Sequence, residues 1–332
     1  MVTIKDIARL ANVSHTTVSR ALNNSPLIKG PTKQKILEIA SQLNYTPNYN
    51  AKSLVTQKSH TIGLFFSSIS NGTSPSFFVD ALKGVNHVIS QDYNLFVRGI
   101  DDYQDFSTIN PLRFDGIILM SQSVQDNSFI YHTMQKGIPL VVLNRYIEEN
   151  HIINILSDDT EGSRQAVEYV IKNGHRDIAI IEGIQGFKST QMRKEGYLQA
   201  LIQHGMSIQP EYSVSGNYDM ESGYLAMNKL LSLHKPPTAV FCSNDDMAIG
   251  AMNAVFAKGL RVPDDISIIG FDDIGFSRYT TPRLTTVKRP TEQISIWGAK
   301  KILSLIMGKQ EKAEKIFANT ELIIRDSVKK ME

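Results

Sequence analysis

Residues 3–23, TIKDIARLANVSHTTVSRALN, decide how the amino-terminal part of the chain folds. Thr3 and Asp6 have the spacing of a capping box, in which two side chains satisfy the free amides at a helix start. The apolar residues that follow lie on one face of a helix: Ile4, Ile7, Ala8 and Ala11. The stretch therefore predicts a short amphipathic helix, which the Asn12-Val13 pair ends.

A second helix follows, and its two faces differ in chemistry. Ser14 is a suitable N-cap, and the inward face carries Val18, Ala21 and Leu22. The outward face carries hydrogen-bonding side chains, namely Thr16, Ser19, Arg20 and Asn23, with His15 beside them at the N-terminal end. Two helices joined in this way are typical of a helix-turn-helix motif. An ordinary helical hairpin with a solvated face fits the same spacing, so these residues alone leave both interpretations open.

The next forty residues distinguish the two interpretations. A third amphipathic helix is predicted over 31–45, with Pro31 in its first turn. Together, IKDIARLANVSHTTVSRALN, this third helix and TPNYNAKSL resemble the lactose/galactose repressor (LacI/GalR) family of sugar-responsive transcription regulators. The resemblance extends along the whole chain. It implies a DNA-binding helix-turn-helix domain over 1–46.

Residues 47–59 have the composition of a linker, apart from a single helical stretch at 48–56 centred on Leu54. The resemblance implies that this stretch is a hinge helix that orders on operator DNA and wedges Leu54 into the minor groove. A flexible tether with one stray leucine is the alternative. Base edges would be read by His15, Thr16 and Arg20, with Arg20 suited to guanine. The full set of expected DNA contacts is Thr3, Ser14, His15, Thr16, Ser19, Arg20, Asn23, Asn48, Ala51, Lys52 and Leu54.

The charge is unevenly distributed. Residues 1–60 contain eight Lys and Arg against two carboxylates, so they carry +6, whereas the whole chain carries +2 and the remainder therefore −4. A basic head on a mildly acidic body is typical of a protein that binds a polyanion with one end. The single cysteine, Cys242, excludes an intrachain disulfide framework and suits the cytoplasm. The sequence shows neither a signal peptide nor an apolar run long enough to span a membrane, so we expect a cytoplasmic protein with no membrane partner.

From Thr61 onward, short apolar runs alternate with helical segments. The runs are TIGLFF, YNLFVRG, FDGIILM, IPLVVLN, DIAIIEG, TAVFCS, ISIIGFD and LTTV. Such alternation predicts parallel sheets with helices on both faces, and roughly 230 residues favour two α/β subdomains over one. This body, 60–330, resembles the periplasmic-binding-protein type, in which ligand lies in a cleft between two subdomains. The resemblance implies discontinuous subdomains, 60–159 with 291–318 and 160–290 with 319–330.

Polar residues directly after the apolar runs are candidates for ligand binding, because ligands bind at the C-terminal ends of strands in open α/β sheets. They include Ser67, Asn144, Asn244 and Asp272; Arg193 lies in the helical segment KSTQMRKEGY and Tyr218 in GNYDMESG. Such groups could bind sugar hydroxyls, with Tyr218 as a stacking platform. Each could instead be a helix cap or a strand-end hydrogen bond.

The resemblance favours some of these candidates over others. MRKEGY, SNDDMAIGAM and IIGFDD match family motifs and support Arg193, Asn244 and Asp272. Asn144 occupies a position where the family often has Asp. The loop SSISNGTSPSFF departs from the family's shorter turn and leaves Phe77 or Phe78 as a candidate contact.

Motifs of the common enzyme classes are absent from the sequence. No two of the eight histidines lie within five residues, and G-x-G-x-x-G, G-x-x-x-x-G-K-[ST] and G-x-S-x-G do not occur. We therefore expect no catalytic residues, no metal site and no cofactor. The adjacent carboxylates Asp245-Asp246 and Asp272-Asp273 are interpreted as caps plus one ligand contact.

The sequence thus predicts a DNA-binding repressor with a small all-α helix-turn-helix head and an α/β body of two doubly wound parallel-sheet subdomains. Its expected partners are double-stranded operator DNA, a small sugar or sugar-phosphate effector, and a second copy of itself, since the end RDSVKKME shows no apolar heptads of a tetramerising tail. One alternative is a catabolite-control regulator that uses a phosphorylated carrier protein as corepressor. That group carries Thr at the position of Asn244, so the amide favours a directly bound sugar. The other alternative is a cytoplasmic sugar-binding protein, or a sugar-modifying enzyme, without a DNA function.

Overall fold

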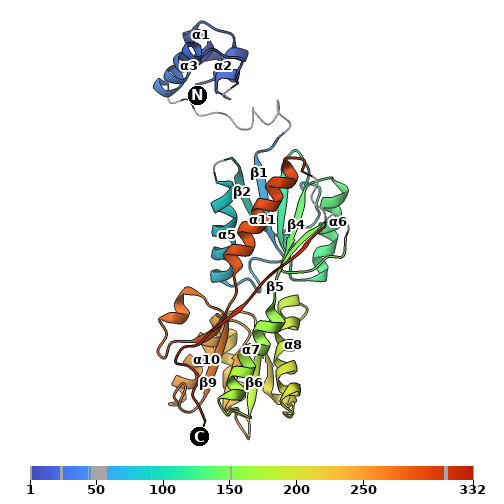
Figure 1. Ribbon diagram of the computed structural model, residues 1–332, viewed down its shortest axis with the longest axis vertical. Helices are drawn as coiled ribbons and strands as arrows, with labels where there is room; N and C mark the ends of the chain where they lie inside the picture. The colour runs from blue at the N-terminus through green and yellow to red at the C-terminus, as the bar shows by residue number, and fades with distance from the viewer. Residues whose placement is uncertain are drawn as a thin grey trace. The chain divides into compact units, whose positions relative to one another are not determined.

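The computed structural model describes residues 2–22, 25–43, 45, 58–90, 92–149, 152–309 and 313–331. The chain forms two compact units, Met1–Gln57 and Lys58–Glu332 (Figure 1). Asn23 and the expected hinge residues Asn48, Ala51, Lys52 and Leu54 lie outside the described residues.

The first unit contains a three-helix bundle. Its helices are α1 (Ile4–Ala11), α2 (His15–Leu22) and α3 (Gly30–Gln42). Asp6 accepts hydrogen bonds from the Thr3 amide (2.9 Å) and hydroxyl, and Ser14 accepts one from the amide of Thr17 (3.1 Å), so the predicted caps are present. The buried core is built from the predicted apolar faces: Ile7, Ala8, Ala11, Val18, Ala21, Ile36 and Ala40.

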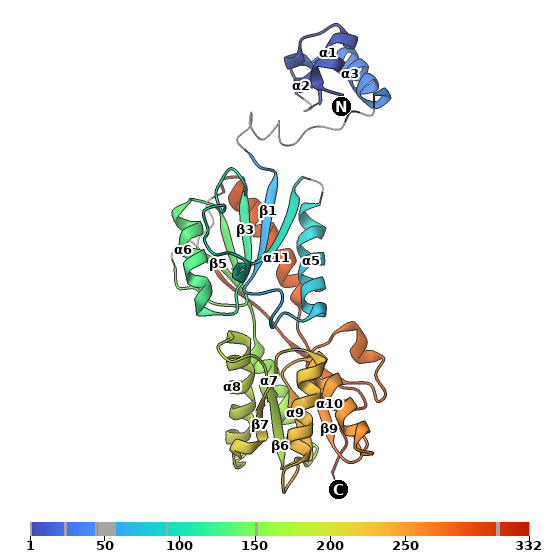
Figure 2. The ribbon, with the colours of Figure 1, turned by 180° about the vertical axis from the view of Figure 1, so that it is seen from behind.

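The second unit consists of two lobes, each built on a six-stranded sheet with helices on both faces (Figures 1 and 2). The first lobe has the strand order β11-β5-β4-β3-β1-β2, and all its strand pairs are parallel. Its elements are β1 (Thr61–Phe66), α5 (Pro75–Ile89), β2 (Asn94–Gly99), β3 (Gly116–Met120), α6 (Asn127–Gln135), β4 (Leu140–Leu143), β5 (Ile153–Ser157), α11 (Thr291–Ile306) and β11 (Lys315–Ala318). Two short 3-10 helices accompany them, η1 (Ile100–Asp102) and η2 (Val124–Asp126).

The second lobe has the strand order β12-β10-β9-β8-β6-β7, and only the β10–β12 pair is antiparallel. Its elements are α7 (Asp159–Lys172), β6 (Ile178–Glu182), α8 (Lys188–Gln203), η3 (Pro210–Tyr212), β7 (Ser213–Ser215), α9 (Met220–Leu231), β8 (Ala239–Cys242), α10 (Asp245–Ala257), β9 (Ser267–Asp272), η4 (Gly275–Arg278), β10 (Thr285–Lys288) and β12 (Glu321–Ile323). The expected parallel, doubly wound architecture is confirmed.

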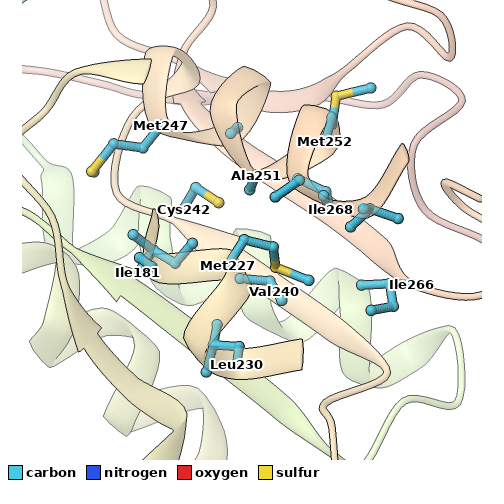
Figure 3. Close-up of a cluster of buried hydrophobic side chains, with 14 of the residues drawn as sticks. Ile181, Met227, Leu230, Val240, Cys242, Met247, Ala251, Met252, Ile266 and Ile268 are labelled. Atoms are coloured by element: carbon cyan, nitrogen blue, oxygen red, sulfur yellow. The ribbon is translucent and has the colours of Figure 1, made fainter. Parts of the chain in front are cut away.

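On the faces of each sheet, apolar side chains of the strands pack against apolar side chains of the covering helices. In the second lobe, Cys242 and Val240 of β8 pack against Met227 and Leu230 of α9 and Ala251 of α10 (Figure 3). Cys242 is fully buried, and this burial raises the pKa of its thiol, so it acts as a small core residue.

The chain crosses between the lobes three times: from β5 into α7, from β10 into α11, and from β11 into β12. Sequence patterns missed four of the strands, namely β5, β7, β11 and β12. Among these, β7 and β12 have only three residues each, and β11 has two exposed positions, so none of the three forms a continuous apolar run. Between β2 and β3, a stretch that the structure describes in full, the only helical element is the short 3-10 helix η1, so this connection has no full crossover helix.

Candidate DNA-binding surface and effector cleft

The outward face of α2 has the chemistry that base recognition requires. His15, Thr16 and Arg20 are exposed, while Val18 and Ala21 on the opposite face are fully buried. Within the described part of the head, Arg20 forms no ion pair, so its guanidinium is available to an external acceptor. Ser14 precedes α2 and its hydroxyl already caps the helix, while Ser19 lies within α2. The Thr3 hydroxyl is likewise engaged with Asp6 (2.7 Å).

A cleft lies between the two lobes, at the C-terminal ends of the strands. It is lined by Phe66, Ser67, Gly72, Thr73, Ser74, Phe77, Met120 and Gln122 of the first lobe, by Phe187, Ser189, Arg193, Tyr218, Asn244 and Asp272 of the second, and by Arg289 of a crossover. Six of the seven predicted ligand residues are in this set, and Asn144 is the exception. The free volume of the cleft is about 30 Å³, which is room for one or two waters.

Arg193 is the most constrained of these residues. Its Nε donates to Asp159 (2.9 Å), its Nη2 donates to Asp272 (3.2 Å), and its Nη1 donates to the carbonyl of Ser243. Its guanidinium also lies 3.9 Å from the centre of the Phe271 ring. A buried guanidinium needs this many partners, and it can bind an effector only through the face and edges that remain open to the cleft.

Asp159 joins this arginine to a second one. Its carboxylate also accepts from Nε of Arg289 (3.2 Å), which donates to Ser157 (2.8 Å) and, through Nη2, to Asn144 (2.9 Å). Burial acts to raise the pKa of Asp159, but Arg289 and Arg193 together hold it below its ordinary value. Burial has the larger effect on Asp272, whose pKa is raised in spite of Arg193 and Arg289. Asp159 is therefore the fixed anion between two buried cations.

The remaining predicted residues combine structural contacts with a position at the cleft. The Tyr218 hydroxyl hydrogen-bonds Ser189 and Thr190, and its ring, 6% exposed, packs against Phe187. Asn244 caps α10 and donates to the carbonyl of Tyr218. These contacts bury the ring proposed as a stacking platform, whereas Phe77 and Phe187 are partly exposed at the cleft.

The first-lobe residues show the same pattern. The hydroxyl of Ser67 donates to Asp126 (2.6 Å). Asn144 is buried and lies behind the cleft surface, where it holds Arg289. Phe78, the alternative to Phe77, packs against Phe66 instead.

The interpretation of the two carboxylate pairs as caps is wrong for Asp245 and Asp273, and the single ligand contact stays a prediction. Asp245 is buried and accepts from the amide of Ile274 (2.9 Å) and the hydroxyls of Ser277 and Thr286, so it holds the loop after β9. Asp273 pairs with Arg325. Both therefore stabilise the second lobe by bonding to other parts of it, and neither caps its own helix or strand.

Sequence reasoning missed several residues of this region, among them Gln122, Asp159, Phe187, Ser189 and Arg289. The rule that found Asp272 could have found two of them. Asp159 follows the apolar run INILS of β5, which was overlooked, and Arg289 follows the strand TTVK, as Asp272 follows the apolar run SIIGF of β9.

Comparisons with known proteins agree with this geometry. Residues 3–48 match the model of the lacI family of bacterial regulatory proteins, and 167–328 match a periplasmic binding protein-like domain. The chain is 72% identical to the probable HTH-type transcriptional repressor ExuR of Bacillus subtilis (strain 168), across 100% of this chain and 99% of that protein. It is 35% identical to the HTH-type transcriptional repressor PurR of Pasteurella multocida (strain Pm70), across 99% of both.

The chain belongs to the lacI family. Among solved structures, the Lac repressor dimer bound to operator and the anti-inducer ONPF superposes with a TM-score of 0.84 at 27% identity, covering 99% of each chain. A complex of the transcriptional regulator CelR with cellobiose superposes with a TM-score of 0.74 at 26% identity, covering 98% of this chain and 100% of that one.

As a lacI family member, the protein is a DNA-binding transcriptional repressor under the control of a small molecule, and it is not an enzyme. Across the described residues, no helix has the length and apolar character needed to cross a bilayer.

Proposed function

We propose that the small molecule is a sugar or sugar phosphate held in the cleft between the lobes. The observation that carries the proposal is the combination of buried charge and aromatic surface there. Arg193 and Asp272 supply bidentate partners for adjacent hydroxyls, while Phe77 and Phe187 present partly exposed rings to an apolar sugar face. The relative solved as a complex with cellobiose supports this class of ligand.

The lobes must separate, or side chains must move, before such a ligand can enter. A free volume of about 30 Å³ is far below the roughly 300 Å³ of a small-molecule pocket. We propose that an effector binds two arrangements of the lobes with different affinity, and this difference sets the size of the response.

A thermal-shift screen over monosaccharides, disaccharides and sugar phosphates tests the effector proposal, because a ligand that binds only the native protein raises its Tm. We expect at least one sugar to raise the Tm of the wild type, with a smaller rise for Arg193→Ala. The proposal fails if no sugar raises the Tm, or if the same sugar stabilises Arg193→Ala equally.

We also propose how the head binds operator DNA. His15, Thr16 and Arg20 meet base edges in the major groove, and Ser14 and Ser19 position the helix on phosphates. The net charge of +6 in residues 1–60 supports this placement. Filter binding at several salt concentrations should give a steep negative log–log slope, and a flat response would contradict it.

A homodimer completes the proposal, because two heads are needed to read a palindromic operator. The solved relative that binds operator is described as a dimer. The second lobe has exposed apolar side chains on α9 and around η4: Met220, Tyr224, Phe276 and Tyr279. Val79 of α5, in the first lobe, is exposed as well. We propose that the surfaces carrying these side chains contact the second copy and that the repressor acts in the cytoplasm, where its operator is.

The domain limits remain part of the proposal. They are a head over 1–46, a linker over 47–59 and a body over 60–330. Within the body, one subdomain comprises 60–159 with 291–318 and the other comprises 160–290 with 319–330. The two sheets support them, because strands from 61–157 and 315–318 form one sheet and strands from 178–288 and 321–323 form the other.

A further inference from the structure

The helix α8 (Lys188–Gln203) begins without a cap of its own. Its N-cap position is occupied by Phe187, whose side chain cannot accept a hydrogen bond. Three other helices of the second lobe, α7, α9 and α10, are capped by the side chains of Asp158, Asp219 and Asn244. The first amides of any helix have no acceptor within that helix. The start of α8 therefore depends on an acceptor from another part of the protein.

Gln122 of the first lobe supplies that acceptor. Its main-chain carbonyl accepts a hydrogen bond from the amide of Lys188 at 2.8 Å, and its side-chain Oε1 accepts one from the amide of Ser189 at 3.4 Å. These are the first two amides of α8. One residue of the first lobe thus caps a helix of the second.

Gln122 is held in place by its own lobe. Its amide donates to the hydroxyl of Ser67 (2.8 Å) and to Oδ2 of Asp126 (3.2 Å). The same oxygen of Asp126 also accepts from the hydroxyls of Ser67 (2.6 Å) and Ser121 (2.7 Å). Asp126 is buried, and a buried polar network with this many bonds is rigid. The direction of the Gln122 carbonyl is therefore fixed without the second lobe.

A second loop of the first lobe contacts the same part of the second lobe. Gly72 has a φ of 80°, and a Cβ there would lie 2.5 Å from Cδ1 of Ile184 and 2.8 Å from Cε2 of Phe187. The residues just before α8 are thus in van der Waals contact with the first lobe. When the lobes separate, this contact is lost together with the acceptors of the Lys188 and Ser189 amides.

We propose that Gln122 is a positioning residue that caps α8 across the cleft, so that the start of this helix holds the ligand-free lobes together. Ser189 and Arg193, which line the cleft, lie in the first two turns of α8, so the cap also sets their position relative to the first lobe. This effect on the cleft rests on the proposed function. The cap itself needs neither effector nor operator, so it is tested without either of them.

Lys188→Pro removes one of the two hydrogen bonds while keeping the helix. Proline suits the first position of a helix, where its missing amide breaks no bond within the helix. It also needs an extended residue before it, and Phe187 is extended, with φ −79° and ψ 137°. Lys188→Ala is the matched control, because it removes the same exposed side chain but keeps the amide.

A thiol at the end of β3 reports lobe separation. Met120 lines the cleft and is 1% exposed, and a free volume of about 30 Å³ excludes a thiol reagent such as DTNB. The thiol introduced by Met120→Cys therefore reacts only when the lobes part. Cys242, fully buried in the core of the second lobe, reacts only when that core opens, so it is an internal control in the same protein.

In full-length protein carrying Met120→Cys, we expect Lys188→Pro to speed labelling of the cleft thiol about fivefold relative to Lys188→Ala, the equivalent of one net hydrogen bond. Labelling of Cys242 should be the same in both proteins. Equal labelling rates of the cleft thiol, or equal acceleration of both thiols, would overturn the proposal.

A second measurement does not depend on the proline variant. In the protein with Met120→Cys alone, the ratio of observed to intrinsic hydrogen-exchange rate at the Lys188 amide should match the ratio of observed to intrinsic labelling rate at the cleft thiol. Both reactions need the same separation of the lobes. Much faster exchange at the Lys188 amide would show that α8 loses its cap while the lobes stay together, which contradicts the proposal.

Discussion

The cleft concentrates unusual backbone as well as buried charge. Asn144, Tyr218, Asp272 and Asp273 all have positive φ, at 71°, 65°, 109° and 54°, although none is glycine. Residues held in sparsely populated conformations persist where the surrounding structure determines them, and they cluster at ligand sites. The hydrogen bonds of Arg193 and Arg289 supply that constraint to Asp272 and Asn144. The local strain thus coincides with the residues proposed to sense the effector.

Asp159 should be among the residues least tolerant of change. Asp159→Asn removes the anion shared by two buried arginines, and an uncompensated buried charge typically costs about 3–5 kcal/mol. We expect a loss of this order in the free energy of unfolding, measured by urea denaturation at pH 7.

A suitable control for this substitution is Asp326→Asn, which breaks an exposed ion pair with Arg283 and should cost far less. Equal stability of Asp159→Asn and the wild type would show that the arginines find other partners.

The proposed contact of Arg20 with a base edge leads to a prediction about operator binding. Arg20→Ala should weaken operator binding by about 1–3 kcal/mol and relax the preference at one base pair, since a bidentate contact to guanine carries discrimination of that size. Binding would be measured for duplexes that vary one position at a time. Arg9→Ala is the control, because Arg9 is exposed on α1 and pairs with Asp6. Weaker binding with unchanged sequence preference would make Arg20 a phosphate contact.

At the scale of elements, glycines set how closely helices approach in the second lobe. A Cβ on Gly250 of α10 would lie 1.9 Å from the carbonyl oxygen of Met220, and one on Gly223 of α9 would lie 2.2 Å from that of Met247. Both obstacles are backbone atoms, which cannot rotate away. The first turns of α9 and α10 therefore pack together only because these positions lack side chains.

Gly250→Ala should destabilise the protein by about 1–3 kcal/mol through this overpacking. Gly275→Ala should have little effect, because a Cβ there meets open space and the backbone does not have a positive φ. Thermal unfolding followed by circular dichroism compares the two. A similar Tm for both variants would mean that α9 can slide along α10 at little cost.

The elements also show what sequence could and could not predict. Long apolar runs such as TIGLFF and ISIIGFD identified the central strands, because strands buried on both faces carry no polar alternation. The edge strands β7, β11 and β12 were not predicted. Edge strands are partly exposed to solvent, so their composition resembles that of loops. Cleft residues that follow recognised strands were found, whereas Asp159 follows a missed strand. The hydrogen bonds that bury Tyr218 and Asn144 depend on the three-dimensional fold and have no signature along the chain.

On the scale of the whole molecule, three crossovers and a buried polar cluster link the two lobes. Arg289 lies in one crossover and bonds Ser157 and Asp159 in another, while its third contact, Asn144, belongs to the first lobe. A ligand that hydrogen-bonds with Arg193 or Asp272 therefore contacts groups that are already linked to the crossovers between the lobes. This arrangement gives the effector a physical means of changing the lobe geometry, as an allosteric repressor requires.

The measurement that tests this account most directly is operator binding with and without effector. A duplex selected from a random pool by the full-length protein would be titrated by filter binding, in the presence and absence of the sugar that raises the Tm most. We predict that the sugar changes the wild-type Kd at least fivefold, and that Arg193→Ala binds the duplex with near-normal affinity but does not respond to the sugar. An unchanged wild-type Kd at saturating sugar, or equal responses of the two proteins, would contradict the account.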